Sequence, residues 1–188
     1  MRSLSGVPDT RQRIYVANHS SHLDFIVLWA NLLPEVRALT RPVAAADYWS
    51  SGIRAYFARD VFNAVLIKRA AAVDGRHAVL DLVEEAVTQM VDALGDVHSL
   101  ILFPEGTRGE GEVGRFRSGL YHLCASRPDV EVMPVYMENL NRILPKGAVI
   151  PVPLLSRIMF GMPIHLEPGE PKPAFLTRTR QAVVDLAV

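Results

Sequence analysis

The stretch VANHSSHLDFIVLW, residues 16–29, places two histidines, an asparagine, two serines and an aspartate between two apolar runs. The run that ends at Ala17 predicts a strand, and the apolar residues after Asp24 predict a helix. In open α/β sheets the carboxyl ends of the strands border the ligand crevice. The polar side chains of this junction are therefore candidates for chemistry.

His19 and Asp24 are the two residues of the stretch best suited to catalysis. On a regular helix, five positions correspond to a rotation of about 140°. Because His19 precedes the first turn, its imidazole can still meet the Asp24 carboxylate. A carboxylate on one ring nitrogen fixes the tautomer and leaves the other nitrogen as a general base. A histidine with a capping aspartate at one strand end is more often structural, so further motifs must decide.

A second polar loop follows the apolar run of residues 100–103 in the sequence LILFPEGTRGEGE. Gly106 lets backbone approach a ligand, Thr107 offers a hydroxyl and a backbone N–H, and Arg108 presents a planar fork suited to phosphate. As a single feature, such a charged loop would be an ordinary solvated turn. Together with the first loop it indicates a binding site.

Lys68 and Arg69 follow a third apolar run in the sequence NAVLIKRA. In isolation they would be partners for surface ion pairs. At the end of a strand they add positive charge beside the same edge of the sheet. The loops after Ala17, Lys68 and Phe103 are therefore expected to converge on one site.

Regular elements that hold these loops are predicted by hydrophobic spacing. Short runs rich in valine and isoleucine alternate with helical patterns, which is typical of an α/β fold with a largely parallel sheet. Strands are predicted over residues 14–17, 42–45, 64–68, 99–103, 131–136 and 159–165. Helices are predicted over residues 23–33, 48–58, about 74–94, 118–125 and 175–186. We expect a single α/β domain, residues 1–188, with a mixed, largely parallel sheet flanked by helices.

Composition limits the class of partner. The 188 residues suit one domain, and 20 basic and 20 acidic residues cancel, so no nucleic-acid partner is expected. The single cysteine, Cys124, excludes an internal disulfide and suits a reducing compartment. The longest apolar stretch near the N-terminus is too short to span a bilayer. A cytoplasmic protein is predicted.

Four ordered blocks make the chain similar to the glycerolipid acyltransferases typified by 1-acylglycerol-3-phosphate acyltransferase. NHSSHLD resembles the N-H-x-x-x-x-D block, LIKR the I-x-R block, FPEGTR the F-P-E-G-T-R block and VMPVY the V-P-V block. FRSG and LPKG resemble weaker family segments. The resemblance defines a motif-bearing core of about residues 14–165. It implies a glycerolphosphate acyltransferase-like fold and transfer of a fatty acyl group from acyl-CoA or acyl carrier protein to a hydroxyl of a phosphorylated glycerolipid.

The dyad fits this reaction. His19 would remove the proton of the acceptor hydroxyl, the alkoxide would attack the thioester carbonyl, and Asp24 would stabilise the imidazolium. No covalent enzyme intermediate is needed. Asn18 or a backbone amide after His19 is expected to donate to the oxyanion.

The second and third blocks are assigned to the acceptor. Arg69 and Arg108, with the backbone around Gly106 and Thr107, would hold the phosphate and place the hydroxyl against the base. Glu105 would repel a phosphate, so it is assigned to orienting an arginine or the acceptor glycerol.

The expected acceptor is a lysophosphatidic acid-type glycerolipid, with glycerol 3-phosphate or a lyso-aminolipid as alternatives. Such a reaction belongs to phospholipid biosynthesis. No cofactor and no metal is expected, because the acyl-CoA or acyl carrier protein is a co-substrate. Since the substrates are lipids, we expect peripheral contact with the inner membrane surface, for which residues 146–161, KGAVIPVPLLSRIMFG, are one candidate.

Other classes fit the sequence less well. A metal hydrolase using His19, His22 and Asp24 lacks the alternating H-x-H-x-D-H pattern, and no later histidine cluster completes a shell. A serine hydrolase would need a G-x-S-x-G elbow, whose first glycine is missing from WSSGI and FRSGL. A non-catalytic lipid-phosphate binder would have no need of a base, which His19 and Asp24 supply.

Overall fold

A central six-stranded sheet organises the molecule. The computed structural model describes residues 8–21, 24–68, 76–107, 109, 112–138 and 157–187. The strands are β1 (Arg13–Ala17), β2 (Thr40–Ala45), β3 (Val65–Ile67), β4 (Ser99–Leu102), β5 (Glu131–Glu138) and β6 (Arg157–Phe160), in the order β3-β2-β4-β1-β5-β6. All neighbours pair in parallel except β5 and β6, which are antiparallel. The predicted mixed, largely parallel α/β sheet is confirmed.

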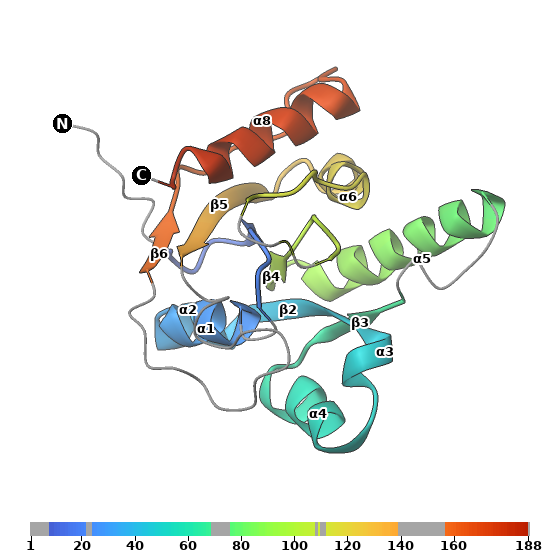
Figure 1. The fold of residues 1–188 in the computed structure, drawn as a ribbon, viewed down its shortest axis with the longest axis vertical. Coiled ribbons are helices and arrows are strands. Elements are labelled where there is room, and N and C mark those ends of the chain that lie inside the picture. The colour runs from blue at the N-terminus through green and yellow to red at the C-terminus, as the bar shows by residue number, and fades with distance from the viewer. Residues whose placement is uncertain are drawn as a thin grey trace.

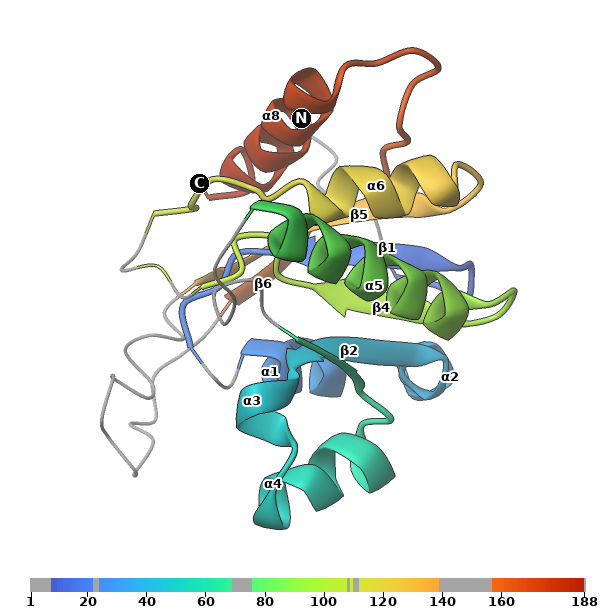
Figure 2. The same cartoon turned by 90° about the vertical axis from the view of Figure 1, so that its right-hand side faces the viewer.

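Helices cover both faces of the sheet (Figures 1 and 2). The helices α5, α6 and α8 lie on one face, and α1 and α2 lie on the other. The helical elements are α1 (Asp24–Asn31), α2 (Pro34–Ala38), α3 (Ala46–Trp49), α4 (Gly52–Tyr56), the π-helical turn η1 (Phe57–Val61), α5 (Arg76–Leu94), α6 (Gly119–Ser126) and α8 (Lys172–Val184).

Alternation along β1 divides the core into two layers. Ile14 and Val16 point into the layer formed with α5, α6 and α8, whereas Tyr15 and Ala17 point into the layer formed with α1 and α2. All five residues of β1 are buried. A strand buried on both faces is typical of the centre of a parallel sheet, and it fixes the position of the loop that follows Ala17.

Two helical predictions are corrected by the structure. The single helix predicted over residues 48–58 is wrong, because the chain breaks at Ser50 and Ser51 and resumes at Gly52 with a positive φ of 60°. The short helix α2 was not predicted, since its five residues, starting at Pro34, are too few to show a helical period. The other predicted helices and all six strands have counterparts in the structure, with shifted ends.

The length and hydropathy of the helices bear on membrane insertion. Across the described ranges, no helix combines the length and the apolar character that a bilayer span requires. The longest, α5, has 19 residues and carries charged side chains along its exposed side.

Candidate active site

His19 and Asp24 meet where β1 gives way to α1. The His19 Nδ1 atom lies 2.9 Å from Asp24 Oδ2. The same oxygen accepts the backbone N–H groups of Ser20 at 2.6 Å and Ser21 at 2.8 Å. Asp24 is fully buried, while 22% of the His19 side chain is exposed. The carboxylate is thus held in one orientation, which leaves the second ring nitrogen of His19 for proton transfer.

The loop after β1 is tied to the loop after β4. The His19 N–H donates to Glu105 Oε1 at 2.9 Å, and the His19 carbonyl accepts the Gly109 N–H at 2.8 Å. The imidazole stacks on the ring of Phe103 with a centroid distance of 4.6 Å. Because β1 and β4 are parallel neighbours, their two terminal loops lie at the same edge of the sheet. His19 is therefore held in place by contacts from the loop after β1 and from the loop after β4.

Glu105 is a buried connector between three segments. Its Oε1 accepts the His19 N–H, its Oε2 accepts the Gly114 N–H at 2.8 Å, and its carbonyl accepts Nε–H of Arg117 at 2.9 Å. The sequence assigned Glu105 to an arginine or to the acceptor glycerol. In the structure it does bond an arginine, through its carbonyl, and both carboxylate oxygens are bonded to backbone.

Asn18 joins the end of β1 to β5. Its Nδ2 donates to the Met137 carbonyl at 3.0 Å, and its Oδ1 accepts the Met137 N–H at 2.7 Å. The side chain is buried. Since both polar groups of the amide are bonded to β5, the role that the structure gives Asn18 is a tether for the loop that carries His19.

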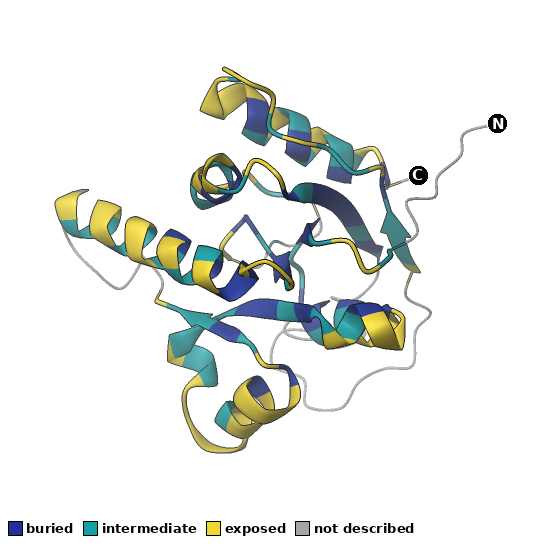
Figure 3. Cartoon of the chain, turned by 180° about the vertical axis from the view of Figure 1, so that it is seen from behind, coloured by how far each residue is buried: buried dark blue, intermediate teal, exposed yellow. Residues whose placement is uncertain are grey.

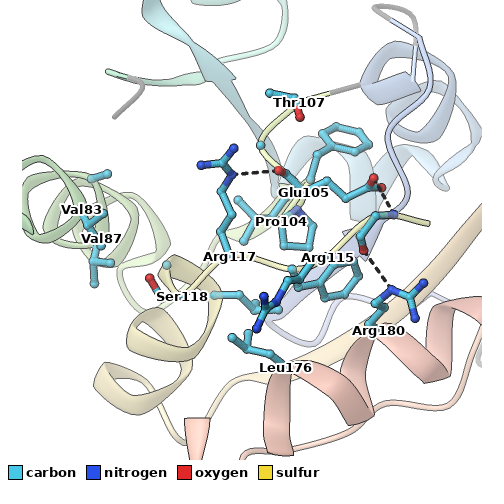
Figure 4. A pocket seen from close by; sticks show the side chains of 18 of the residues that line it. Val83, Val87, Pro104, Glu105, Thr107, Arg115, Arg117, Ser118, Leu176 and Arg180 are labelled. Atoms are coloured by element: carbon cyan, nitrogen blue, oxygen red, sulfur yellow. Dashed lines mark hydrogen bonds between the residues drawn. The ribbon is translucent and has the colours of Figure 1, made fainter. Parts of the chain in front are cut away.

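Gly106 has a conformation and a neighbour that exclude a side chain. Its φ is +73°, and a Cβ built on it would lie 2.6 Å from Nε of Arg117. The sequence predicted that this glycine admits a ligand. In the structure, the group that comes close to Gly106 is the side chain of Arg117. This side chain passes Gly106 and donates to the Glu105 carbonyl (Figure 4).

Arg117 was not among the predicted site residues. Its only sequence signal is the FRSG segment of the resemblance. Among the described residues, its two terminal nitrogens form no hydrogen bond. The N–H groups of these two nitrogens can therefore bind a ligand while Nε holds the guanidinium in place. Thr107 lies beside it and is exposed.

A cavity of about 940 Å³ lies next to the loop that follows β4. It lies between α5, the loop after β4, the start of α6 and α8 (Figure 4). Phe103, whose far side stacks on His19, is part of its wall. An apolar side is formed by α5 through Val79, Leu82, Val83, Ala86, Val87 and Met90, and basic side chains come from Lys68, Arg115, Arg117, Lys172 and Arg180.

Three residues named from the sequence, Arg69, Arg108 and His22, lie outside the described residues. The prediction that Arg69 and Arg108 hold a phosphate therefore stays a prediction. Lys68, which directly follows β3, lines the same cavity as Gly106 and Thr107.

The sheet and the site together define an α/β protein in which a histidine is held by a buried carboxylate near a cavity with an apolar wall and basic side chains. The chain belongs to the acyltransferase family, whose model matches residues 2–138. The predicted family and the predicted acyltransferase activity are confirmed at this level.

The fold is also that of a solved acyltransferase. The chain is similar to the crystal structure of the 1-acyl-sn-glycerophosphate (LPA) acyltransferase PlsC from Thermotoga maritima, with a TM-score of 0.71 and 20% sequence identity. The match covers 99% of this chain and 69% of that one. A comparison with curated proteins finds no match.

Proposed function

We propose that the protein transfers a fatty acyl group from a thioester, acyl-CoA or acyl carrier protein, to a hydroxyl of a lysophosphatidic acid-type glycerolipid. The observation that carries the proposal is the His19–Asp24 pair, with 2.9 Å between Nδ1 and Oδ2, whose imidazole stacks on Phe103. Phe103 in turn lines a cavity that is apolar on one side and basic on another. The solved relative of the same fold is a 1-acyl-sn-glycerophosphate acyltransferase, which supports this acceptor class.

In the proposed reaction, the second ring nitrogen of His19 takes the proton of the acceptor hydroxyl as its oxygen attacks the thioester carbonyl. Asp24 balances the charge of the imidazolium that forms. The tetrahedral intermediate collapses, the carbon–sulfur bond breaks, and the thiolate receives the proton from His19. The balance is one ester and one thiol, and it needs neither a cofactor nor a metal.

The basic side chains of the cavity are proposed to hold the acceptor phosphate. Arg69 and Arg108 remain the residues named from the sequence, with Gly106 and Thr107 shaping the loop. To these we add Arg117, because its Nε is fixed on the Glu105 carbonyl and its remaining N–H groups are oriented by that bond. A fixed guanidinium loses less entropy when it binds an anion.

The apolar side of α5 is proposed to contact a fatty chain. Burial of each methylene contributes roughly 0.8 kcal/mol, so a wall of six aliphatic side chains favours long chains over short ones. With lipid substrates, we propose a cytoplasmic enzyme of phospholipid biosynthesis held peripherally at the inner membrane surface.

An acyl-transfer screen tests the proposal. Purified protein would be given radiolabelled acyl-CoA and acyl carrier protein donors with lysophosphatidic acid, glycerol 3-phosphate, lysophosphatidylcholine and a lyso-aminolipid. We expect the fastest turnover with lysophosphatidic acid. A higher kcat/KM for an acceptor without phosphate would refute the assignment of the basic side chains, and binding of lysophosphatidic acid without turnover on any donor would indicate a lipid-phosphate binder.

A further inference from the structure

The segment of α4 and η1 has large apolar side chains on its outer side. Within the described part of the chain, eight large hydrophobic residues are exposed, and four of them fall in this one segment. They are Ile53, Tyr56, Phe57 and Val61, with exposed fractions of 73%, 58%, 40% and 39%. We call these four residues the 53–61 ridge. Figure 3 shows the corresponding helix mainly as exposed surface.

The inner side of the same segment is formed by one small residue and by the phenylalanine that follows η1. Ala58, at 1% exposed, and the aromatic ring of Phe62 face the protein. Spacings of three and four residues put Ile53, Tyr56 and Phe57 on the opposite face. A helix that packs only on its own domain normally turns its large apolar residues inward. In this segment the four large apolar residues of the 53–61 ridge are exposed instead, which indicates that its outer face has a partner.

Charge and shape narrow the class of partner. Between residues 51 and 62, the exposed Arg54 and Arg59 outnumber the one acidic residue, Asp60. The segment lies at the end of the molecule away from α8 in both views (Figures 1 and 2). Aliphatic and aromatic side chains flanked by arginines on a projecting helix suit the boundary between headgroups and acyl chains, where guanidinium groups meet lipid phosphates.

The ridge is also connected to the active site by packed rings. Phe57 stacks with Phe62 with 6.2 Å between the ring centroids, and Phe62 contacts Phe25 edge to face with 5.1 Å between the centroids. Phe25 directly follows Asp24 in α1. A membrane surface in contact with the ridge is therefore connected, through these packed rings, to α1, the helix that carries Asp24.

We infer that the 53–61 ridge is the part of this protein that docks on an anionic lipid bilayer, inserting Ile53, Tyr56 and Phe57 among the headgroups. The inference rests on the proposed function for its choice of partner, since that function requires access to membrane lipids. The sequence suggested residues 146–161 for membrane contact, and of these residues 146–156 lie outside the described part of the chain, so that suggestion stays a prediction beside this inference.

Vesicle flotation tests the inference. Vesicles of phosphatidylcholine with 30% phosphatidylglycerol, containing neither lysolipid nor acyl donor, would be mixed with wild type, with the triple variant Ile53→Ser, Tyr56→Ser, Phe57→Ser, and with the control Leu80→Ser, Val97→Ser. The control removes two equally exposed apolar residues, 58% and 54%, from other parts of the surface. We expect the triple variant to lose vesicle affinity by about tenfold or more and the control to match wild type.

A second variant distinguishes the attraction of the arginines to anionic lipid from the insertion of the apolar side chains. Arg54→Gln with Arg59→Gln should weaken binding to the anionic vesicles, reduce its salt dependence, and leave the weaker binding to pure phosphatidylcholine unchanged. Equal vesicle binding by wild type and the triple variant, or no binding by wild type, would overturn the inference. So would a wild-type dimer that the triple variant converts to monomer in light scattering, because the partner would then be a second copy.

The outcome is independent of the proposed reaction. Acyl transfer to a short-chain, water-soluble lysophosphatidic acid would be measured beside flotation. If the triple variant loses vesicle binding but keeps full turnover in that assay, the lost function is membrane docking by the ridge and not acyl transfer. Vesicle binding without any acyl transfer would contradict the proposed function and leave the ridge in place.

Discussion

The side chain of Arg117 passes directly over the α-carbon of Gly106, so that a Cβ at Gly106 would lie 2.6 Å from Nε of Arg117 and 2.9 Å from its Cδ. The arginine uses this closeness to bond the Glu105 carbonyl. Glu105 in turn holds the N–H of His19. A glycine, an arginine and a glutamate thus form one continuous support for the catalytic loop, and each link can be tested separately.

Gly106→Ala should destabilise the protein in a way that depends on Arg117. An alanine at φ +73° is strained, and its methyl group displaces the guanidinium. We expect the free energy of unfolding in urea to fall by about 1–3 kcal/mol. In the background of Arg117→Ala the loss should be smaller by about 0.5 kcal/mol or more. Full additivity of the two changes would show that Arg117 does not occupy this position.

Arg117→Ala should raise the acceptor KM about tenfold or more while the donor KM stays near that of wild type, because the phosphate is charged in both ground and transition states. Arg117→Lys should recover only part of the loss, since lysine lacks the Nε–H that bonds Glu105. Steady-state kinetics with lysophosphatidic acid measure this. Arg11→Gln, at an exposed ion pair, is the control. An unchanged acceptor KM would remove Arg117 from the phosphate site.

His19→Ala should lower kcat by roughly 10²-fold to 10⁴-fold with little effect on folding, because the removed ring is the proposed general base and lies at the edge of the sheet. Asp24→Asn should also lower kcat, since an amide cannot balance an imidazolium. His122→Ala, which removes an exposed histidine on α6, should retain activity. Turnover near wild type in either dyad variant would contradict the mechanism.

Glu105→Gln tests whether Glu105 supports the loop that carries His19 or binds the acceptor. Its carboxylate oxygens bond the N–H groups of His19 and Gly114, so an amide NH₂ would oppose one of these donors. We expect a loss of about 1–3 kcal/mol in the free energy of unfolding and a lower kcat, with the acceptor KM little changed. Urea titration and kinetics on one preparation measure both. A raised acceptor KM at wild-type stability would support instead the contact with the acceptor glycerol that the sequence suggested.

Cys124 should be chemically silent in the folded protein. Burial raises the pKa of its thiol to about 12, and its side chain is 1% exposed. At pH 8 the thiolate is therefore scarce, so alkylation by iodoacetamide should be slower than in 8 M urea by on the order of 10²-fold or more. Mass spectrometry follows the reaction. Rapid alkylation of the native protein, or loss of acyl transfer in Cys124→Ala at retained stability, would contradict a packing role.

The parts of the fold that follow from local pattern could be predicted. The run Ser99–Leu102 is buried at every residue and was recognised as a strand. By contrast, β2 begins at Thr40, two residues before the predicted start at Pro42. Thr40 is buried and its hydroxyl donates to the Val36 carbonyl at 2.7 Å, so a polar residue sits inside the sheet because of a partner that no hydrophobic pattern reveals.

The same distinction applies to the site. The contact of His19 with Asp24 could be predicted because five residues of chain separate them. The bond from Arg117 to the Glu105 carbonyl spans twelve residues and depends on the left-handed turn at Gly106, so sequence spacing gave no sign of it. The exposed face of Ile53, Tyr56 and Phe57 was not predicted either, because it follows from the helix break at Ser50 and Ser51 and from the burial of Ala58 and Phe62.

The double hydrogen bond between Asn18 and Met137 has a consequence for biosynthesis. The strand that carries the loop with His19 is synthesised before both of its neighbours in the sheet, β4 and β5. At about 5–20 residues per second, roughly 6–24 seconds pass between synthesis of Ala17 and of Met137. Because β4 ends at Leu102 and β5 at Glu138, β1, apolar at four of its five positions, lacks both strand partners for most of that time. In the nascent chain, β1 therefore needs chaperone protection until these partners are made, and the bonds that hold the loop with His19 against β5 cannot form before Met137 has been translated.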